Sequence, residues 1–169
     1  MQINQSEFNH INSIQTVTNS KQIIEVIHEA FKRYESDPMP SSALLETSAM
    51  IDENIKDGIV ILGAYVNEQL VGVVKVTNQN NSYYFSRLAV LPTYQKKGIA
   101  SLLVAAIENV AAETNIHVVQ CKVRKTEADN IRLYQKLGYS ITKEELTTSP
   151  TGFIMETVTM EKHNNSTVI

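Results

Sequence analysis

The sequence offers its clearest chemistry, anion binding, in the segment "QKKGIAS", residues 95–101. Lys96 and Lys97 supply positive charge, and Gly98 has no Cβ, so a bulky anion can approach its backbone. An apolar repeat with helical spacing begins at Ile99. The first turn of a helix has N–H groups without intrahelical acceptors, and its dipole favours negative charge. The segment therefore predicts a phosphate-binding turn at the start of a helix.

Two better-known phosphate loops do not match this segment. A Walker loop needs Gly-x-x-x-x-Gly-Lys-Ser/Thr, which does not occur here, and a dinucleotide fingerprint needs more glycines than Gly98 alone. Taken by itself, the segment also fits a solvated basic turn with a chance glycine.

A second set of candidate residues lies in "TEADNIRLYQKLGY", residues 126–139, which has helical spacing. Asn130 and Tyr134 are four residues apart, so both side chains project from one face of the helix. An amide beside a phenol suits a ligand that has amide groups and a leaving group to be protonated. The alternative is that Tyr134 is a core tyrosine with a satisfied hydroxyl.

The elements that would position these residues follow the order β-α-α-β-β-β-α-β-α-β-β. We expect a weak strand up to Val17, helices over 20–37 and 44–57, strands over 59–66, 69–77 and 83–90, a helix from Ile99, a strand over 117–123, a helix over 126–137, and strands over 139–146 and 152–162.

Several positions predict how these elements begin, turn and end. Ser20 is available as N-cap of the first helix, and Asn67-Glu68 joins two strands as a hairpin. Thr126 and Asp129 have capping-box spacing, and Gly138 suits the left-handed position after a helix. No linker or repeat divides the chain. We expect one mixed α/β (α+β) domain over residues 1–169, with a flexible tail from about residue 163.

The composition narrows the partners and the location. A net charge of −3 over 169 residues argues against a nucleic-acid binder, which needs a surplus of basic residues. No apolar run approaches the ~20 residues that span a bilayer, and the N-terminus lacks the features of a signal peptide. Cys121 is the single cysteine, which favours a reducing cytoplasm, and we expect it to be a buried residue rather than a nucleophile. The four histidines are scattered, so we expect no metal site.

Together the two candidate segments resemble the GNAT superfamily of acetyl-coenzyme A-dependent N-acetyltransferases. The pyrophosphate signature of that family, Gln/Arg-x-x-Gly-x-Gly/Ala, is similar to Gln95 through Ala100, and the preceding "LAVLP" matches its strand pattern. "ADNIRLYQKLGY" resembles its second cofactor segment. The resemblance covers essentially the whole chain and implies a central sheet whose middle strands splay apart.

The resemblance implies acetyl-CoA as co-substrate, no metal, and a role for each matching position. Backbone groups of 88–90 would pair with the pantetheine arm, residues 95–101 would hold the pyrophosphate, and Asn130 would hydrogen-bond the pantetheine. The implied cofactor-binding residues are Leu88, Ala89, Val90, Gln95, Lys96, Lys97, Gly98, Ile99, Ala100, Ser101, Asn130 and Tyr134.

The implied reaction is direct attack of a primary amine on the thioester. A backbone N–H near Val90 would stabilise the oxyanion. Tyr134, with an ordinary pKa near ~10, remains protonated at neutral pH and would act as general acid for the leaving thiolate.

One position departs from the family pattern. Many members have a glutamate just before the "L-x-V" of this strand, where this chain has Ser86-Arg87. Arg87 cannot act as a base. The proton of the amine would leave through a water chain, or through a carboxylate such as Glu46 or Glu127. Arg87 could instead recognise a carboxylate on the substrate, or form a structural ion pair.

The acceptor is expected to be a small-molecule or peptide amine. Its specificity is expected in the segment 35–46, in Tyr83-Tyr84 and in the turn 147–153. The missing glutamate leaves a non-catalytic acyl-CoA-binding or regulatory module as the alternative function. A homodimer is common in the family, although no stretch of this sequence indicates one.

Overall fold

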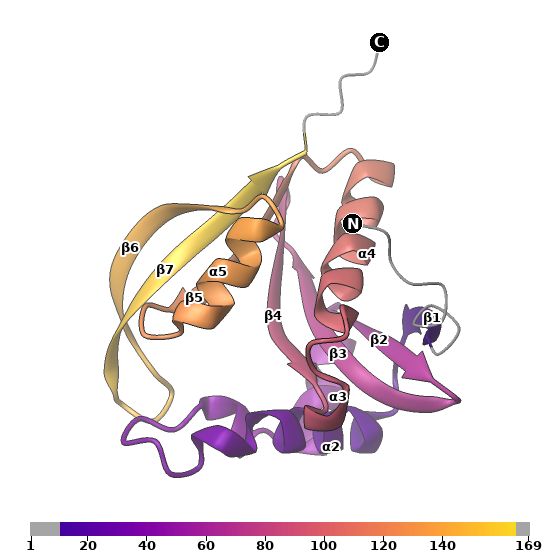
Figure 1. The fold of residues 1–169 in the computed structure, drawn as a ribbon, viewed down its shortest axis with the longest axis horizontal. Coiled ribbons are helices and arrows are strands. Elements are labelled where there is room, and N and C mark those ends of the chain that lie inside the picture. The colour runs from indigo at the N-terminus through magenta and orange to yellow at the C-terminus, as the bar shows by residue number, and fades with distance from the viewer. Residues whose placement is uncertain (1–10, 165–169) are drawn as a thin grey trace. The chain divides into compact units, whose positions relative to one another are not determined.

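The computed structural model describes residues 11–164, and its helices and strands follow the predicted order (Figure 1). The described part has seven strands and four α-helices, which confirms the mixed α/β fold. It divides into two compact units, and each is described separately below. Unit 1 comprises residues up to Thr77 and Arg87–Ala106, and unit 2 comprises Asn78–Ser86 and residues from Ile107 onward.

Unit 1 is a set of antiparallel strands with helices packed on them. Strands follow the order β1-β2-β3-β4, with β1 antiparallel to β2 and β2 antiparallel to β3. The elements are β1 (Ile11–Thr16), α2 (Ser20–Phe31), two 3₁₀ helices (Lys32–Tyr34 and Ser42–Leu45), α3 (Ser48–Lys56), β2 (Val60–Val66), β3 (Gln69–Asn78), the end of β4 (Ser82–Val90), the 3₁₀ helix Pro92–Tyr94 and the first half of α4 (Ile99–Glu113).

Helix α2 covers the core of unit 1 with one apolar face. Its buried side chains are Ile23, Val26, Ile27 and Ala30, which recur at helical spacing. The prediction of Ser20 as N-cap is wrong by one residue. Asn19 has the extended backbone of a cap, and its side chain accepts a hydrogen bond from the Gln22 N–H at 3.1 Å. Ser20 is already helical.

The second predicted helix is shorter than expected. Leu44 lies in the 3₁₀ turn Ser42–Leu45, and Thr47 is the N-cap of α3, where its hydroxyl accepts from the Met50 N–H at 3.2 Å. The apolar spacing that started at Leu44 therefore runs across two separate elements. Extended residues at Glu46 and Thr47 interrupt the helical backbone between them.

The predicted hairpin between β2 and β3 is present. Asn67 and Glu68 both have positive φ, +48° and +67°, as a tight two-residue hairpin turn requires. Farther along β3, Gly72 permits close packing of α4. A Cβ at Gly72 would lie 3.1 Å from Ile99 and 3.3 Å from Leu103, so the missing side chain positions the start of α4 on the strand.

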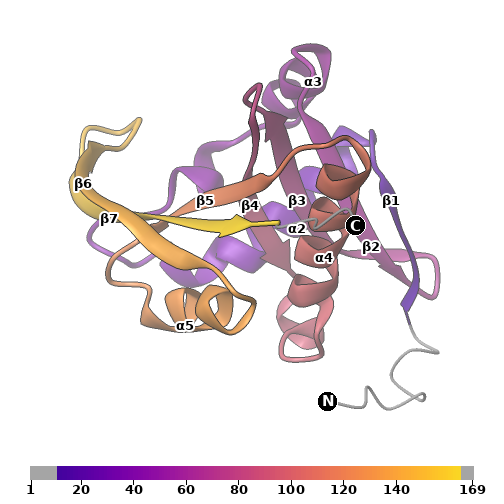
Figure 2. The ribbon, with the colours of Figure 1, turned by 90° about the horizontal axis from the view of Figure 1, so that it is seen from above.

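Unit 2 is a second set of strands covered by α5. The strand order is β4-β5-β7-β6, with β4 parallel to β5 over Ser82–Tyr84 and the other pairs antiparallel. The family resemblance also implies that β4 and β5 splay apart beyond these residues. The end of β4 belongs to unit 1 and β5 to unit 2, so this splay stays a prediction. The remaining elements are β5 (Val118–Arg124), α5 (Ala128–Lys136), β6 (Ser140–Thr148) and β7 (Ile154–His163). Figure 2 shows α5 along one face of these strands.

The termini of α5 confirm one prediction and overturn another. Gly138 follows the helix with φ +98°, as predicted. The capping box between Thr126 and Asp129 is wrong, because the N-cap position is Glu127 and it has no side-chain cap hydrogen bond. Asp129 instead pairs with Arg132 on the helix surface. At the end of the described chain, His163 still belongs to β7; residues 165–169 of the predicted tail lie outside the described residues.

Candidate active site

The predicted phosphate turn of unit 1 has an unusual backbone. Lys96 and Gly98 both have positive φ, +61° and +83°, on either side of Lys97. Turns that include left-handed residues can direct successive backbone N–H groups toward one place, where they bind an anion. Helix α4 begins directly afterwards at Ile99, and an added Cβ at Gly98 would meet no atom within 4 Å. The turn therefore has open space for a bulky anion at Gly98, next to the first N–H groups of α4.

Neighbouring residues hold the turn in this shape. The 3₁₀ helix Pro92–Tyr94 ends β4, and the Tyr94 N–H donates to the Leu91 carbonyl at 2.8 Å. The side chain of Gln95 donates from Nε2 to the Val90 carbonyl at 3.0 Å. Gln95 is among the residues expected to hold the pyrophosphate, whereas this hydrogen bond uses its side-chain amide to connect the turn to the end of β4.

The predicted pantetheine-binding segment 88–90 forms the last residues of β4. Ala89 and Val90 are buried, and the following residue, Leu91, donates its N–H to the Val71 carbonyl of β3 at 2.8 Å. One side of this strand end is therefore fixed by β3. The segment is rigidly connected to the phosphate turn, as a common cofactor site would require.

Arg87, the residue directly before this segment, belongs to a buried cluster of charged side chains. Glu46 Oε1 accepts from Lys75 Nζ at 2.8 Å and from Arg87 Nε at 3.2 Å. Lys75 also donates to Asn54 Oδ1 at 2.7 Å, and Arg87 Nη2 donates to Ser42 Oγ at 2.8 Å. The side chains of Lys75 and Glu46 are only 7% and 10% exposed, whereas Arg87 is 25% exposed. The cluster joins the loop before α3 to strands β3 and β4.

Two features of this cluster are unusual. Glu46 Oε2 is buried and has no hydrogen-bond partner among the described residues. Arg87 has φ +53°, a left-handed conformation that costs a non-glycine residue on the order of 1 kcal/mol. Strain of this kind often marks functional sites. Glu46 and Glu127 are the two carboxylates predicted to take the proton of the amine. Glu46 contacts Arg87 in unit 1, whereas Glu127 belongs to unit 2.

The second predicted group belongs to an aromatic cluster in unit 2. Tyr134 is 7% exposed, and its ring packs edge-on against Phe85 and Tyr139 with centroid distances of 5.6 and 6.1 Å. Burial, and next the charge of Glu108, raise the pKa of Tyr139 well above its usual range. Asn130, one turn before Tyr134, is half-buried. The aromatic packing restricts the direction of the Tyr134 ring.

The structure thus brings the predicted residues together in two groups. Residues 88–90 and 95–101 form a continuous strand end and turn in unit 1. Asn130 and Tyr134 share one helix in unit 2. That both groups contact one cofactor stays a prediction.

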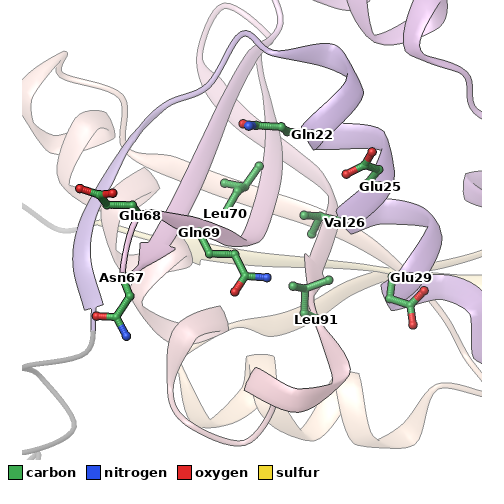
Figure 3. Close-up of a pocket in the computed structure, with 9 residues that line it drawn as sticks. All are labelled: Gln22, Glu25, Val26, Glu29, Asn67, Glu68, Gln69, Leu70 and Leu91. Carbon is green, nitrogen blue, oxygen red and sulfur yellow. The ribbon is translucent and has the colours of Figure 1, made fainter.

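A pocket of about 590 Å³ opens on unit 1 between α2, the β2–β3 turn and Leu91. Figure 3 shows Glu25, Glu29 and Glu68 around it, with apolar side chains including Leu91 between them. No basic residue lines it. This chemistry is opposite to that of the basic phosphate turn, so the pocket would attract cations rather than phosphate groups.

A second pocket, of about 670 Å³, lies on the strands of unit 2, and Tyr84 lines it. Tyr83 does not, since its hydroxyl hydrogen-bonds Thr114 Oγ1 at 3.0 Å. Only one of the two tyrosines predicted to determine acceptor specificity therefore faces this pocket. The lining residues are Gln79, Tyr84, Gln120, Lys122, Thr142, Lys143, Glu145, Thr159 and Glu161.

Cysteine and histidine often act in catalysis, but Cys121 and His28 have structural roles here. Cys121 is buried, and burial raises the pKa of its thiol to about 12, which makes it a poor nucleophile, as expected. His28 Nε2 donates to the Glu46 backbone carbonyl at 2.7 Å. Within residues 11–164 no three His, Cys, Asp or Glu side chains gather as a metal-binding group. No helix in the same range combines the length and apolarity needed to cross a membrane.

Comparison with known proteins decides the family. The model of the acetyltransferase (GNAT) family matches residues 22–139, which is more than half of the chain. The chain belongs to the GNAT acetyltransferase family. This GNAT protein has no match among curated proteins.

Solved structures of other acetyltransferases share the fold of this GNAT protein. A probable acetyltransferase from Staphylococcus epidermidis superimposes with a TM-score of 0.75 at 14% identity, covering 90% of this chain and 98% of the other. The PaiA N-acetyltransferase from Thermoplasma acidophilum, in complex with coenzyme A, gives 0.71 at 19% identity, covering 89% and 99%. A ribosomal-protein-alanine N-acetyltransferase from Brucella melitensis gives 0.71 at 18% identity, covering 89% and 99%.

Lys75 and Ser42, two partners in this GNAT protein's ion cluster, are not among the residues predicted from the sequence. A signal for Lys75 was present. It is the one charged residue in the apolar run "LVGVVKVT", and a lysine in a buried strand requires a partner. Ser42 carried no comparable signal, because serine is common in irregular loops.

Proposed function

We propose that this protein transfers an acetyl group from acetyl-CoA to a primary amine of a small molecule or peptide. The observation that carries the proposal is the turn with left-handed Lys96 and Gly98, which leaves open space at Gly98 directly before helix α4 in a chain of the GNAT family. The single cysteine is compatible with a reducing compartment, and we expect the reaction to take place in the cytoplasm.

The residues of unit 1 fit the phosphate groups of the cofactor. Open space at Gly98 would receive the pyrophosphate, and the N–H groups of the turn and of the first turn of α4 would donate to it. Lys96 and Lys97, both exposed, would add charge. The strand end 88–90 would orient the pantetheine arm, and a backbone N–H near Val90 would donate to the acetyl oxygen as it gains charge.

The residues of unit 2 would complete the reaction. Acetyl-CoA supplies a thioester whose carbonyl is open to attack by the neutral amine. Asn130 would hydrogen-bond the pantetheine, and Tyr134 would give its proton to the leaving sulfur. The proton lost by the amine would leave through a water chain or a carboxylate such as Glu46. The edge-on contacts of the Tyr134 ring with Phe85 and Tyr139 would keep its hydroxyl in one direction.

Calorimetric titration with coenzyme A tests the binding step. We expect a Kd in the micromolar range or tighter (about −8 kcal/mol). Gly98→Glu places a side chain and a negative charge in the turn and should abolish binding. Gly58→Glu is the matched control, because Gly58 also has positive φ (+95°) and no atom within 4 Å of an added Cβ, and it follows α3 instead. Equal affinity of the two variants would exclude the turn as the phosphate site.

Thiol release in the presence of an amine panel tests the transfer step. Tyr134→Phe retains the aromatic packing and removes the hydroxyl, so it should lower kcat by about a hundredfold while the Kd of coenzyme A changes little. Unchanged kcat with several good acceptors would remove the general-acid role of Tyr134.

A non-catalytic acyl-CoA-binding module is the second candidate. It is favoured by Arg87, which stands where many family members have a glutamate. This candidate predicts coenzyme A binding without acetyl transfer to any amine. Thiol release that depends on one particular amine would exclude it.

A further inference from the structure

We propose that Arg87 binds a carboxylate of the acetyl acceptor, so that the preferred substrates are amines that also carry a carboxylate, such as amino acids and short peptides. This inference rests on the proposed acetyl transfer and specifies its substrate class.

Arg87 is placed and oriented for such a contact. It directly precedes Leu88, the first residue of the segment expected to hold the thioester arm. Glu46 holds its Nε and Ser42 holds its Nη2, so the guanidinium has one fixed orientation. Its Nη1 has no hydrogen bond to any described residue, and the side chain is 25% exposed. Of the five guanidinium N–H groups, both of Nη1 and the second of Nη2 are therefore left for a carboxylate, which arginine can bind through two parallel hydrogen bonds.

The charge of the cluster favours an anionic group. Lys75 and Arg87 carry two formal positive charges against one negative charge on Glu46. Both cations contact the same oxygen, Oε1. The cluster therefore has one more cation than carboxylate. The excess positive charge lies in a largely buried place, where its attraction for a substrate carboxylate is weakly screened.

The backbone of Arg87 provides an independent argument. A bulky residue with φ +53° inside a strand is strained, and asparagine or glycine would occupy this conformation at lower cost. The strain persists because the contacts with Glu46 and Ser42 hold the residue. These two are positioning residues, since they act on the substrate through Arg87.

Polyamines are the competing substrate class. The acidic pocket of unit 1, with Glu25, Glu29 and Glu68, would attract a polycation. Leu91, which lines that pocket, follows Arg87 by four residues, at most about 13 Å along an extended strand. A polyamine reaching the thioester would therefore approach the excess positive charge of the cluster, which opposes its binding.

Matched acceptors test the proposal on the wild-type enzyme with acetyl-CoA. The probes are phenylalanine, phenylalaninamide and phenethylamine, then a dipeptide and its amide, and spermidine as the polyamine. The readout is kcat/KM from thiol release. We expect kcat/KM for each acid to exceed that for its amide by at least about tenfold, mainly because the acid has a lower KM. Spermidine should be the poorest acceptor.

Variants assign the preference to Arg87. In Arg87→Gln, kcat/KM for the acid should fall to the value for its amide, while kcat/KM for the amide should change less than about threefold. The Kd of coenzyme A, measured by calorimetry, should remain unchanged. Arg33→Gln removes the same charge from an exposed position of unit 1 and should retain the preference. Should Arg87→Gln fail to fold, Arg87→Lys keeps the charge beside Glu46 and should show a reduced ratio of acid to amide.

The outcomes separate this inference from the proposed function. Equal rates for acids, amides and amines, or spermidine as the best acceptor, would overturn the carboxylate assignment while confirming acetyl transfer. A preference for acids that survives in the Arg87 variants would overturn the role of Arg87. Binding of coenzyme A without transfer to any probe would overturn the proposed function itself.

Discussion

Removal of the Glu46 carboxylate should destabilise the protein more than any surface substitution. Lys75 Nζ would then have Asn54 Oδ1 as its one described acceptor, in a position where the lysine side chain is 7% exposed. Arg87 would retain Ser42. Two cations that share one buried carboxylate would thus lose it together in Glu46→Ala.

The expected loss follows from burial. Breaking a buried ion pair by removing one partner costs about 3–5 kcal/mol, because an uncompensated charge stays buried. Typical domains have about 5–15 kcal/mol of stability in total, so this is a large fraction. For a chain of this size the melting temperature should fall by about 2–4 °C per kcal/mol, on the order of 10 °C in all.

Urea unfolding followed by circular dichroism measures this loss. Glu144→Gln is the control, since Glu144 pairs with Lys125 at 3.4 Å and both side chains are about half exposed. Its expected cost is below about 1 kcal/mol. The double variant Glu46→Leu, Lys75→Met removes both buried charges and should recover part of the loss, because an apolar replacement of a buried pair is often neutral or stabilising.

A loss of stability as small as that of the control would contradict this prediction. If Glu46→Ala loses less than about 1 kcal/mol, the Lys75 ammonium reaches water without the carboxylate, and the cluster is not the buried network that its low exposure indicates. Water would then also screen the excess positive charge of the cluster formed by Lys75, Arg87 and Glu46. The stability measurement therefore also checks a premise of the substrate-class inference.

Three further predictions concern other parts of the chain. Burial raises the pKa of Cys121 from 9.0 to about 12, so the unfolded chain loses this proton first and the free energy of unfolding should fall as pH rises between those values. Urea unfolding at several alkaline pH values should show a shallower fall for Cys121→Ala. Gly72→Ala pushes a Cβ to 3.1 Å from Ile99 and should cost about 1–3 kcal/mol and weaken coenzyme A binding, measured by urea unfolding and calorimetry. Asn19→Ala should cost about 1 kcal/mol in thermal unfolding and Ser20→Ala much less; equal losses would contradict the observed cap.

Local features of the fold were predictable from short segments. The Asn67-Glu68 hairpin and the left-handed Gly138 follow from the conformational preferences of a few adjacent residues, and the structure contains both. Helix starts were less predictable. Asn19 and Ser20 are both good caps, and the choice between them depends on where the apolar face of α2 meets the core. The Thr126–Asp129 spacing matched a capping box, yet spacing alone does not bring the side chains to the backbone N–H groups.

The candidate site was predictable only in part. The turn at 95–101 and the pair Asn130 and Tyr134 could be identified because each lies within one short segment. The aromatic cluster of Phe85, Tyr134 and Tyr139 could not, because its members come from separate elements.

The order of helices and strands, the turn at Gly98 and the family signature could all be inferred from short stretches of sequence, because each depends on residues that are close together in the chain. The cluster of Glu46, Lys75 and Arg87, in contrast, is visible only in the folded protein. Such contacts join residues far apart in the chain and depend on how burial of apolar surface packs the segments between them. The charge next to the proposed acetyl site, and with it the expected choice of substrate, is therefore a property of the folded chain.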